Sequence, residues 1–304
     1  MRPLVIYCDG GFGNRFNALV SGLVISATLG LRPQVVWPVN NWCGAPFDSL
    51  FENDLPVIDR ELASFMPERD RYQYFIVEDR LGLADEWVSP LHLPHWDTVR
   101  ALFAKSDKPV FYYTALIPSF IDAAAGLAQV RALRLRAAIV TRAEEFLSSR
   151  QIGARHGDFF GVQIRKTDFG ANGADDDNQF ELISQRPQQR FFVCSDDKEV
   201  EQRFGALPQV ATFPKRAHVE KRIEGQWTTI TADHSGRLYP CNVNRGAASV
   251  EDALVDLLIL SRSQIIKTSN STFLNTALLL RQAAAMPSSA LPGAAAAASE
   301  TAEA

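Results

Sequence analysis

Short apolar runs alternate with segments of helical periodicity along most of this chain. Residues 4–7 form an apolar run, glycines interrupt it at 10–13, and apolar side chains then recur at helical spacing as far as Gly30. A second apolar run at 34–37 completes a strand–helix–strand unit. Parallel strands need a crossover connection of this kind, so the alternation predicts an α/β fold with parallel sheets.

The second half of the chain repeats this rhythm after a glycine-containing segment at 151–158. Strands are predicted at 159–164, 190–194, 210–213 and 264–266. Helices are predicted over 127–149, over 180–184, over 197–204, from Ser249 with Asp252 at capping-box spacing, and from Ser271 to about residue 284. We therefore expect an N-terminal domain over 1–152, a C-terminal domain over 153–285 and a disordered alanine-rich tail over 286–304.

Composition and charge exclude several classes of protein. The 304 residues amount to about two domains, and 46% hydrophobic with 22% charged residues excludes collagen, coiled coil and wholesale disorder. The net charge of −4, from 31 basic and 35 acidic side chains, gives no basic excess for a nucleic-acid partner. No apolar stretch approaches the ~18 residues of a membrane span, and the N-terminus lacks a secretory apolar segment. We expect a cytoplasmic protein with no transmembrane segment and four reduced, mostly buried cysteines.

Three predicted strand ends in the second half carry residues suited to an anion. The relevant side chains are Arg165, Lys166 and Asp168 after the first strand, Ser195, Asp196 and Asp197 after the second, and Ser271 and Thr272 after the last. Ligands bind at the carboxyl ends of parallel strands, and arginine forks and helix N-termini suit phosphate. Each motif alone also has a structural interpretation, as a surface ion pair in the first case and as helix caps in the others.

Two other motifs are weaker. The glycine loop at 10–13 lacks the third glycine of a dinucleotide fingerprint, where Phe16 stands, and the next strand ends in Trp37-Pro38 instead of an acidic residue, which disfavours nicotinamide or flavin chemistry. The acidic run 175–177 contains a DxD, which could bind a cation in metal-dependent sugar transfer. Its glycine-rich surroundings favour a solvated turn, so no metal site is predicted.

Taken together, these motifs resemble those of a known family. GVQIRKTDF at 161–169 resembles the H-x-R-R-x-D strand-end motif of the α1,6-fucosyltransferases and the NodZ-type nodulation fucosyltransferases. The SDD at 195–197 and EDALVDLLILSRSQIIKTSNSTF at 251–273 resemble the second and third motifs of the same superfamily, which includes protein O-fucosyltransferases. The opening loop and ATLGLRPQVVWPVNNWCGAPFDSLF at 27–51 resemble the NodZ-type N-terminus, and the resemblance runs in patches from about residue 8 to 280.

The resemblance implies a GT-B fold, with two Rossmann-like α/β domains facing across a cleft. It implies an inverting glycosyltransferase that uses GDP-fucose, releases GDP and requires no metal or other cofactor. The C-terminal half would bind the donor, and the N-terminal half would bind a carbohydrate acceptor such as a glycan or a lipo-oligosaccharide. Without a membrane anchor, such a protein fits a bacterial cytoplasmic enzyme.

The resemblance also assigns roles to individual residues. Arg165 would clamp the diphosphate with the help of Lys166, and Asp168 would orient this cluster or contact the donor. Asp196 and Asp197 would bind the nucleoside end of the donor. The rest of the donor site would consist of Asp256, Ser271 and Thr272, together with Gly11, Gly13, Asn14 and Arg15 of the opening loop.

The sequence departs from the family motif at three positions. Gln163 stands in place of the usual histidine, Lys166 replaces the second arginine, and an ungapped count puts Gly173 where an acidic base is proposed in eukaryotic members. Asp9 and the acidic run 175–177 are substitutes for that base. A non-catalytic sugar-nucleotide-binding protein, a transferase for another nucleotide sugar and a Rossmann-type oxidoreductase stay open as alternatives. The sequence leaves the acceptor, the linkage and the oligomeric state undetermined.

Overall fold

The first half of the chain forms a parallel five-stranded sheet. The computed structural model describes residues 1–77, 95–152, 157–167, 176–223, 241–268 and 271–286. The strand order is β3-β2-β1-β5-β4, and every pairing is parallel. The strands are β1 (Pro3–Tyr7), β2 (Arg32–Val36), β3 (Val57–Ile58), β4 (Gln73–Ile76) and β5 (Val110–Tyr113).

Both faces of this sheet are covered, as expected for parallel strands. Helix α1 (Phe12–Leu29) packs on the face that carries Leu4 and Ile6, and it is buried along most of its length. The short 3-10 helices η1 (Leu62–Ser64) and η2 (Met66–Arg71) lie in the region of the opposite face, where Leu62 joins Val5 and Tyr7 in one apolar cluster. The helices α2 (Phe47–Leu50), α3 (Trp96–Phe103) and α4 (Ala123–Ala132) also belong to this half.

The second half forms a parallel four-stranded sheet of order β11-β6-β7-β8. Its strands are β6 (Phe160–Ile164), β7 (Phe191–Ser195), β8 (Val210–Ala211) and β11 (Gln264–Ile266). Helices α6 (Asp176–Ser184) and α7 (Lys198–Gly205) pack on the face that carries Val162 and Ile164. The opposite face packs against α8 (Ala247–Arg262), where Gly161 lies under Leu260 and Ser263. A short antiparallel ribbon joins β9 (Glu220–Lys221) and β10 (Val243–Asn244).

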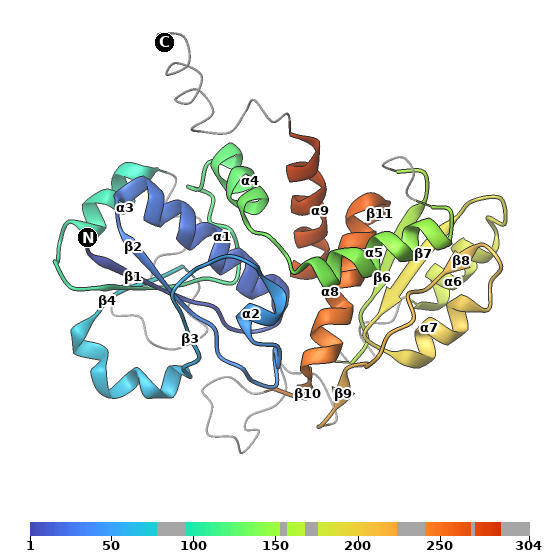
Figure 1. The fold of residues 1–304 in the computed structure, drawn as a ribbon, viewed down its shortest axis with the longest axis horizontal. Helices are drawn as coiled ribbons and strands as arrows, with labels where there is room; N and C mark the ends of the chain where they lie inside the picture. The colour runs from blue at the N-terminus through green and yellow to red at the C-terminus, as the bar shows by residue number, and fades with distance from the viewer. Residues whose placement is uncertain (78–94, 153–156, 168–175, 224–240, 269–270, 287–304) are drawn as a thin grey trace, which may run out of the picture.

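Two helices pack across the halves of the chain. The sheets lie side by side, with α8 and α9 (Thr272–Ala285) running between them (Figure 1). Helix α5 (Ala137–Ser149) belongs to the first half of the chain but packs against α8, and α9 from the second half packs against α1 and α4. The predicted fold class, two Rossmann-like α/β units, is confirmed. The division at residues 152 and 153 stays a prediction.

Two helix predictions were wrong. The segment 127–149 is not one helix, because residues 133–136 leave the helix between α4 and α5: Leu135 forms a β-bridge with Phe51, and the Arg136 amide donates to the Leu50 carbonyl at 2.9 Å. Helix α8 begins at Ala247 instead of being capped by Ser249, whose hydroxyl donates back to the Gly246 carbonyl. In the first case a long-range contact outweighs the local pattern, whereas in the second a local hydrogen bond within the first turn takes the place of the predicted cap.

Other predicted features are located as follows. All four cysteines are free and buried, as expected. Within the described residues, no helix is long and apolar enough to cross a bilayer. The predicted tail lies outside the described residues, apart from Met286.

The two halves meet through main-chain contacts. The Gly44 amide donates to the Arg245 carbonyl at 2.7 Å, and the Arg245 amide donates to the Asn41 carbonyl at 2.9 Å. Gly13, in the first turn of α1, faces the first turn of α9 so closely that a Cβ atom there would lie 2.8 Å from the Thr272 carbonyl carbon. Glycine at position 13 therefore permits the contact between the two helices.

We predict that Gly13→Ala destabilises the protein by about 1–3 kcal/mol, because the added methyl group would force the main chains of α1 and α9 apart. Thermal or denaturant unfolding measures the change. Gly11→Ala is the matched control, since no atom lies within 4 Å of a Cβ there; it should change stability by less than about 1 kcal/mol. Equal stability of the two variants would contradict the close packing.

Candidate functional site

The first part of the site is the turn between β1 and α1. Gly10 has a φ of 78°, a left-handed conformation that glycine adopts at little cost. Helix α1 follows from Gly11 with no side-chain cap and no acidic residue in its first turn, and Asn14 there is partly exposed. The N-terminal amides of a long helix attract anions, so this turn offers positive partial charge at the carboxyl end of the first sheet.

Arg15 holds this turn from inside. Its guanidinium is fully buried and donates to the carbonyls of Gly10 and Pro38, each at 2.7 Å, and to Oδ1 of Asn40 at 2.9 Å. These partners enclose the charge and join the loop after β1 to the loop after β2. The role of Arg15 in the donor site stays a prediction.

Asp9 lies just before this turn and is 7% exposed. Its Oδ1 is 3.8 Å from Nη2 of Arg15, and no hydrogen bond reaches that oxygen from the described residues. An acceptor oxygen in this state could take a proton or a hydrogen bond. The interpretation of Asp9 as a substitute base stays a proposal.

The second part of the site is the N-terminus of α9. Ser271 caps this helix, since its hydroxyl accepts from the Phe273 amide at 3.1 Å, as its position in the sequence predicts. Thr272 follows at the contact with Gly13, so the N-terminal ends of α1 and α9 meet. The Thr268 hydroxyl donates to the Gln163 carbonyl at 2.7 Å and ties the loop before α9 to the end of β6.

The third part of the site is the loop after β6, which carries Arg165. Asp196, just after β7, accepts from the main-chain amides of Lys166 at 2.8 Å and Thr167 at 3.2 Å, and also from the Thr167 hydroxyl. Arg165 is partly exposed at the start of this loop. Asp196 therefore shapes the loop that presents the arginine.

Lys166 is paired with an acidic residue at the start of α6. Its Nζ donates to Oδ2 of Asp176 at 2.9 Å; this bond raises the pKa of Lys166 and lowers that of Asp176. Arg203 lies 3.8 Å from Asp176 and 2.7 Å from Asp177. Asp176 and Asp177, the described part of the acidic run, are thus paired with cations. Asp175 of that run and the predicted site residue Asp168 lie outside the described residues. Among the described residues no group of three or more His, Cys, Asp or Glu side chains could hold a metal ion.

Asp197 differs from its neighbour Asp196. It is the N-cap of α7 and accepts from the amides of Glu199 at 2.8 Å and Val200 at 3.2 Å. This geometry matches the structural interpretation of Asp197 as a cap, and its role at the nucleoside end stays a prediction.

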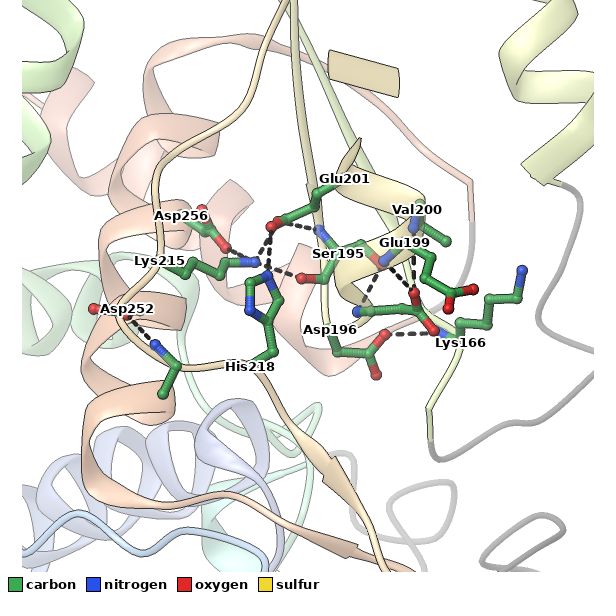
Figure 2. Close-up of polar contacts among 12 residues, drawn as sticks. Lys166, Ser195, Asp196, Glu199, Val200, Glu201, Lys215, His218, Asp252 and Asp256 are labelled. Atoms are coloured by element: carbon green, nitrogen blue, oxygen red, sulfur yellow. Dashed lines mark hydrogen bonds and ion pairs between the residues drawn. The ribbon is translucent and has the colours of Figure 1, made fainter. Parts of the chain in front are cut away.

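Asp256 lies inside the second half at 3% exposure. Its Oδ2 is 2.8 Å from Nζ of Lys215, which also contacts Glu201 (Figure 2). Burial raises the pKa of Asp256 to about 7, with a further contribution from the Glu201 carboxylate and opposition from the Lys215 ammonium. This oxygen pairs with Lys215, and the role of Asp256 in the donor pocket stays a prediction. Asp256 Oδ1 has no hydrogen-bond partner among the described residues.

Sequence reasoning missed the residues that hold these loops from below. Glu201 and Lys215 belong to no motif, and Asn40 lies in the segment 27–51 without being singled out there; only the fold brings these residues to Ser195, Asp256 and Arg15. Lys215 was visible only as one cation in a long polar loop. Asp256 lies among the apolar residues of its helix, and a buried carboxylate needs a cationic partner. That need is the signal that could have pointed to Lys215.

The chain was compared with known proteins. No protein-family model and no curated protein sequence matches it. A solved structure of NodZ α-1,6-fucosyltransferase co-crystallised with GDP matches with 17% identity over 92% of each chain and a TM-score of 0.54. The same enzyme soaked with GDP-fucose, and fucosyltransferase NodZ from Bradyrhizobium, each match with 18% identity over 92% of both chains and a TM-score of 0.54. The chain has the fold of these fucosyltransferases. The resemblance predicted from the motifs is thereby confirmed at the level of the fold.

The buried position of Asp256 predicts a specific pH dependence. Because its pKa in the folded protein is raised above the ordinary 3.8 to about 7, the folded state binds this proton more tightly than the unfolded state. The contribution of Asp256 to stability must then fall as the pH rises from about 4 to about 7. Relative to Asp256→Asn, the native protein should lose stability over this range.

Denaturant unfolding of both proteins at intervals of pH measures this difference. The charged groups that face Asp256 are Lys215, Glu201, Asp252 and, when ionised, Cys194. They are present in both proteins and cancel to first order. A difference that grows with pH would show that attraction to Lys215 outweighs burial.

Proposed function

We propose that this protein is an inverting, metal-independent glycosyltransferase that transfers fucose from GDP-fucose to a glycan or lipo-oligosaccharide acceptor. The single observation that carries the proposal is the meeting of the N-termini of α1 and α9, with the loop before α9 bonded to the Gln163 carbonyl two residues before Arg165. Two helix N-termini and neighbouring cations favour a ligand with several negative charges, such as a diphosphate.

The proposed donor site uses groups from both halves. Arg165 would hold the diphosphate with its planar fork, and Lys166 would add a second charge beside it. The amides near Gly11 and Gly13, the side chain of Asn14, and the first turn of α9 at Ser271 and Thr272 would approach the same anion. Asp196 would act by shaping the Arg165 loop, since it already binds the main chain there.

The chemistry follows from the charge that develops on the leaving group. An acceptor hydroxyl attacks C1 of the sugar from the face opposite the diphosphate, the bond from C1 to the phosphate oxygen breaks, and GDP leaves with inversion. Arg165 would stabilise the negative charge that grows on the diphosphate, where electrostatic help lowers the barrier most. The hydroxyl proton passes to a base, for which Asp9 is the candidate in this proposal.

A ligand panel tests the donor class. We predict that GDP and GDP-fucose raise the melting temperature and that EDTA leaves the shift unchanged, because binding to the native state stabilises it. GDP-mannose, UDP and NAD are the comparison ligands. A shift with only another nucleotide would replace the donor, and a shift with none of them would contradict a nucleotide-sugar site.

Arg165→Ala tests the site itself. We predict that it lowers transfer, or hydrolysis of GDP-fucose in the absence of an acceptor, by at least ~100-fold, since a donor aimed at developing charge is lost. The release of GDP measures the rate. Arg186→Ala removes an exposed arginine of the same half and should leave the rate unchanged. Native protein that binds GDP-fucose without any turnover would indicate a sugar-nucleotide-binding protein instead.

A further inference from the structure

Lys215 is a buried lysine that contacts three separate elements. It lies in the loop after β8, and its side chain is 6% exposed. Its Nζ donates to the carbonyl of Ser195 at the end of β7, to Oε1 of Glu201 on α7 and, at 2.8 Å, to Oδ2 of Asp256 on α8 (Figure 2). One ammonium group thus joins the end of a strand to helices on both faces of the sheet.

Ser195 is held on both sides of its main chain. Its amide donates to Oε1 of Glu201 at 2.9 Å, while its carbonyl accepts from Lys215. The other oxygen of Glu201 lies 2.9 Å from Nε2 of His218. The last residue of β7 therefore has its position fixed by buried charged groups, in addition to its strand pairing with Ile164.

Asp196, the next residue, connects Ser195 to the Arg165 loop. Asp196 follows Ser195 directly and accepts from the main-chain amides of Lys166 and Thr167 (Figure 2 shows the bond to Lys166). A shift of Ser195 would move the Asp196 carboxylate and release these two amides. Lys215 is thus connected to the Arg165 loop through Ser195 and Asp196.

Stability alone is a weak reason for this arrangement. Replacing a buried ionic group with apolar side chains of similar volume is often neutral or stabilising, because charges lose their hydration on burial. Burial alone would lower the pKa of Lys215, but the carboxylates of Asp256 and Glu201 outweigh burial and raise it. The ammonium therefore stays charged and keeps its donors directed at Ser195 and the two carboxylates.

We propose that Lys215 is a positioning residue for the loop from Arg165 to Thr167: it fixes Ser195 and, through Asp196, the main chain that presents Arg165. The consequence for ligand binding rests on the proposed function, whereas the positioning itself does not. Lys215 touches neither the donor nor the acceptor in this proposal.

Amide hydrogen exchange on the ligand-free full chain tests the positioning directly. In Lys215→Met, the Lys166 and Thr167 amides should exchange at least ~10-fold faster, because local opening of the loop becomes easier. Peptides from β1 and β2 should exchange as in the native protein. Lys198→Met is the matched control, since Lys198 is an exposed lysine at the start of α7. Unchanged exchange at 166 and 167, or an equal rise throughout the chain, would overturn the proposal.

A charge-balanced variant separates positioning from charge compensation and also serves if Lys215→Met does not fold. Lys215→Met combined with Glu201→Gln and Asp256→Asn removes the ammonium and both carboxylates that it pairs. If Lys215 only neutralises these carboxylates, exchange at 166 and 167 should return to native rates. If it positions Ser195, exchange should stay at least ~10-fold faster, since the donor to the Ser195 carbonyl is still missing.

Affinity for GDP, measured by calorimetry, links the result to ligand binding. We expect Lys215→Met to weaken GDP binding at least ~10-fold while Lys198→Met leaves it unchanged. Faster exchange at 166 and 167 with native GDP affinity would overturn the claim that this positioning serves the anion site. If the native protein binds no GDP, the proposed function fails, and the exchange rates still decide whether Lys215 holds the loop.

Discussion

The contact between Gly13 and Thr272 is the constraint on which the candidate site depends. It brings the first turns of two helices from opposite halves of the chain within van der Waals reach. Both helices begin here, so the positive ends of their dipoles face each other. Such ends would repel one another unless other contacts held the helices together. The packing of α9 against α1 and α4, and the hydrogen bond between Gly44 and Arg245, supply those contacts.

Two buried cations order the loops that carry the candidate site. Arg15 joins the turns after β1 and β2, and Lys215 joins β7 to α7 and α8. Both belong to the interior, and each binds carbonyl oxygen at the carboxyl end of a sheet. In each half a buried charge orders the main chain, while Asn14 and Arg165 are partly exposed.

The sequence allowed the parallel sheets and the Ser271 cap to be predicted, because strand periodicity and helix caps are local signals. It did not allow the break between α4 and α5 to be predicted, since that break depends on a bridge between Leu135 and Phe51. In the candidate site, motif matching pointed to Arg165 and Asp196, and the structure shows that Asp196 binds the loop that follows Arg165. Motif matching could not distinguish Arg15, a motif residue enclosed by carbonyl groups, from a residue that faces solvent, because enclosure is decided by loops distant in the sequence.

The junction between the two halves is built from main-chain contacts. The Gly44 amide, the Arg245 carbonyl and the Thr272 main chain make their contacts whatever side chains surround them. Side chains beside these main-chain contacts can then change without altering the contacts. Gln163 and Lys166 depart from the fucosyltransferase motif that this sequence resembles, and Lys166 has its own partner, Asp176. These main-chain contacts thus follow from the fold, whereas the ligand that the site accepts depends on the side chains that this chain presents.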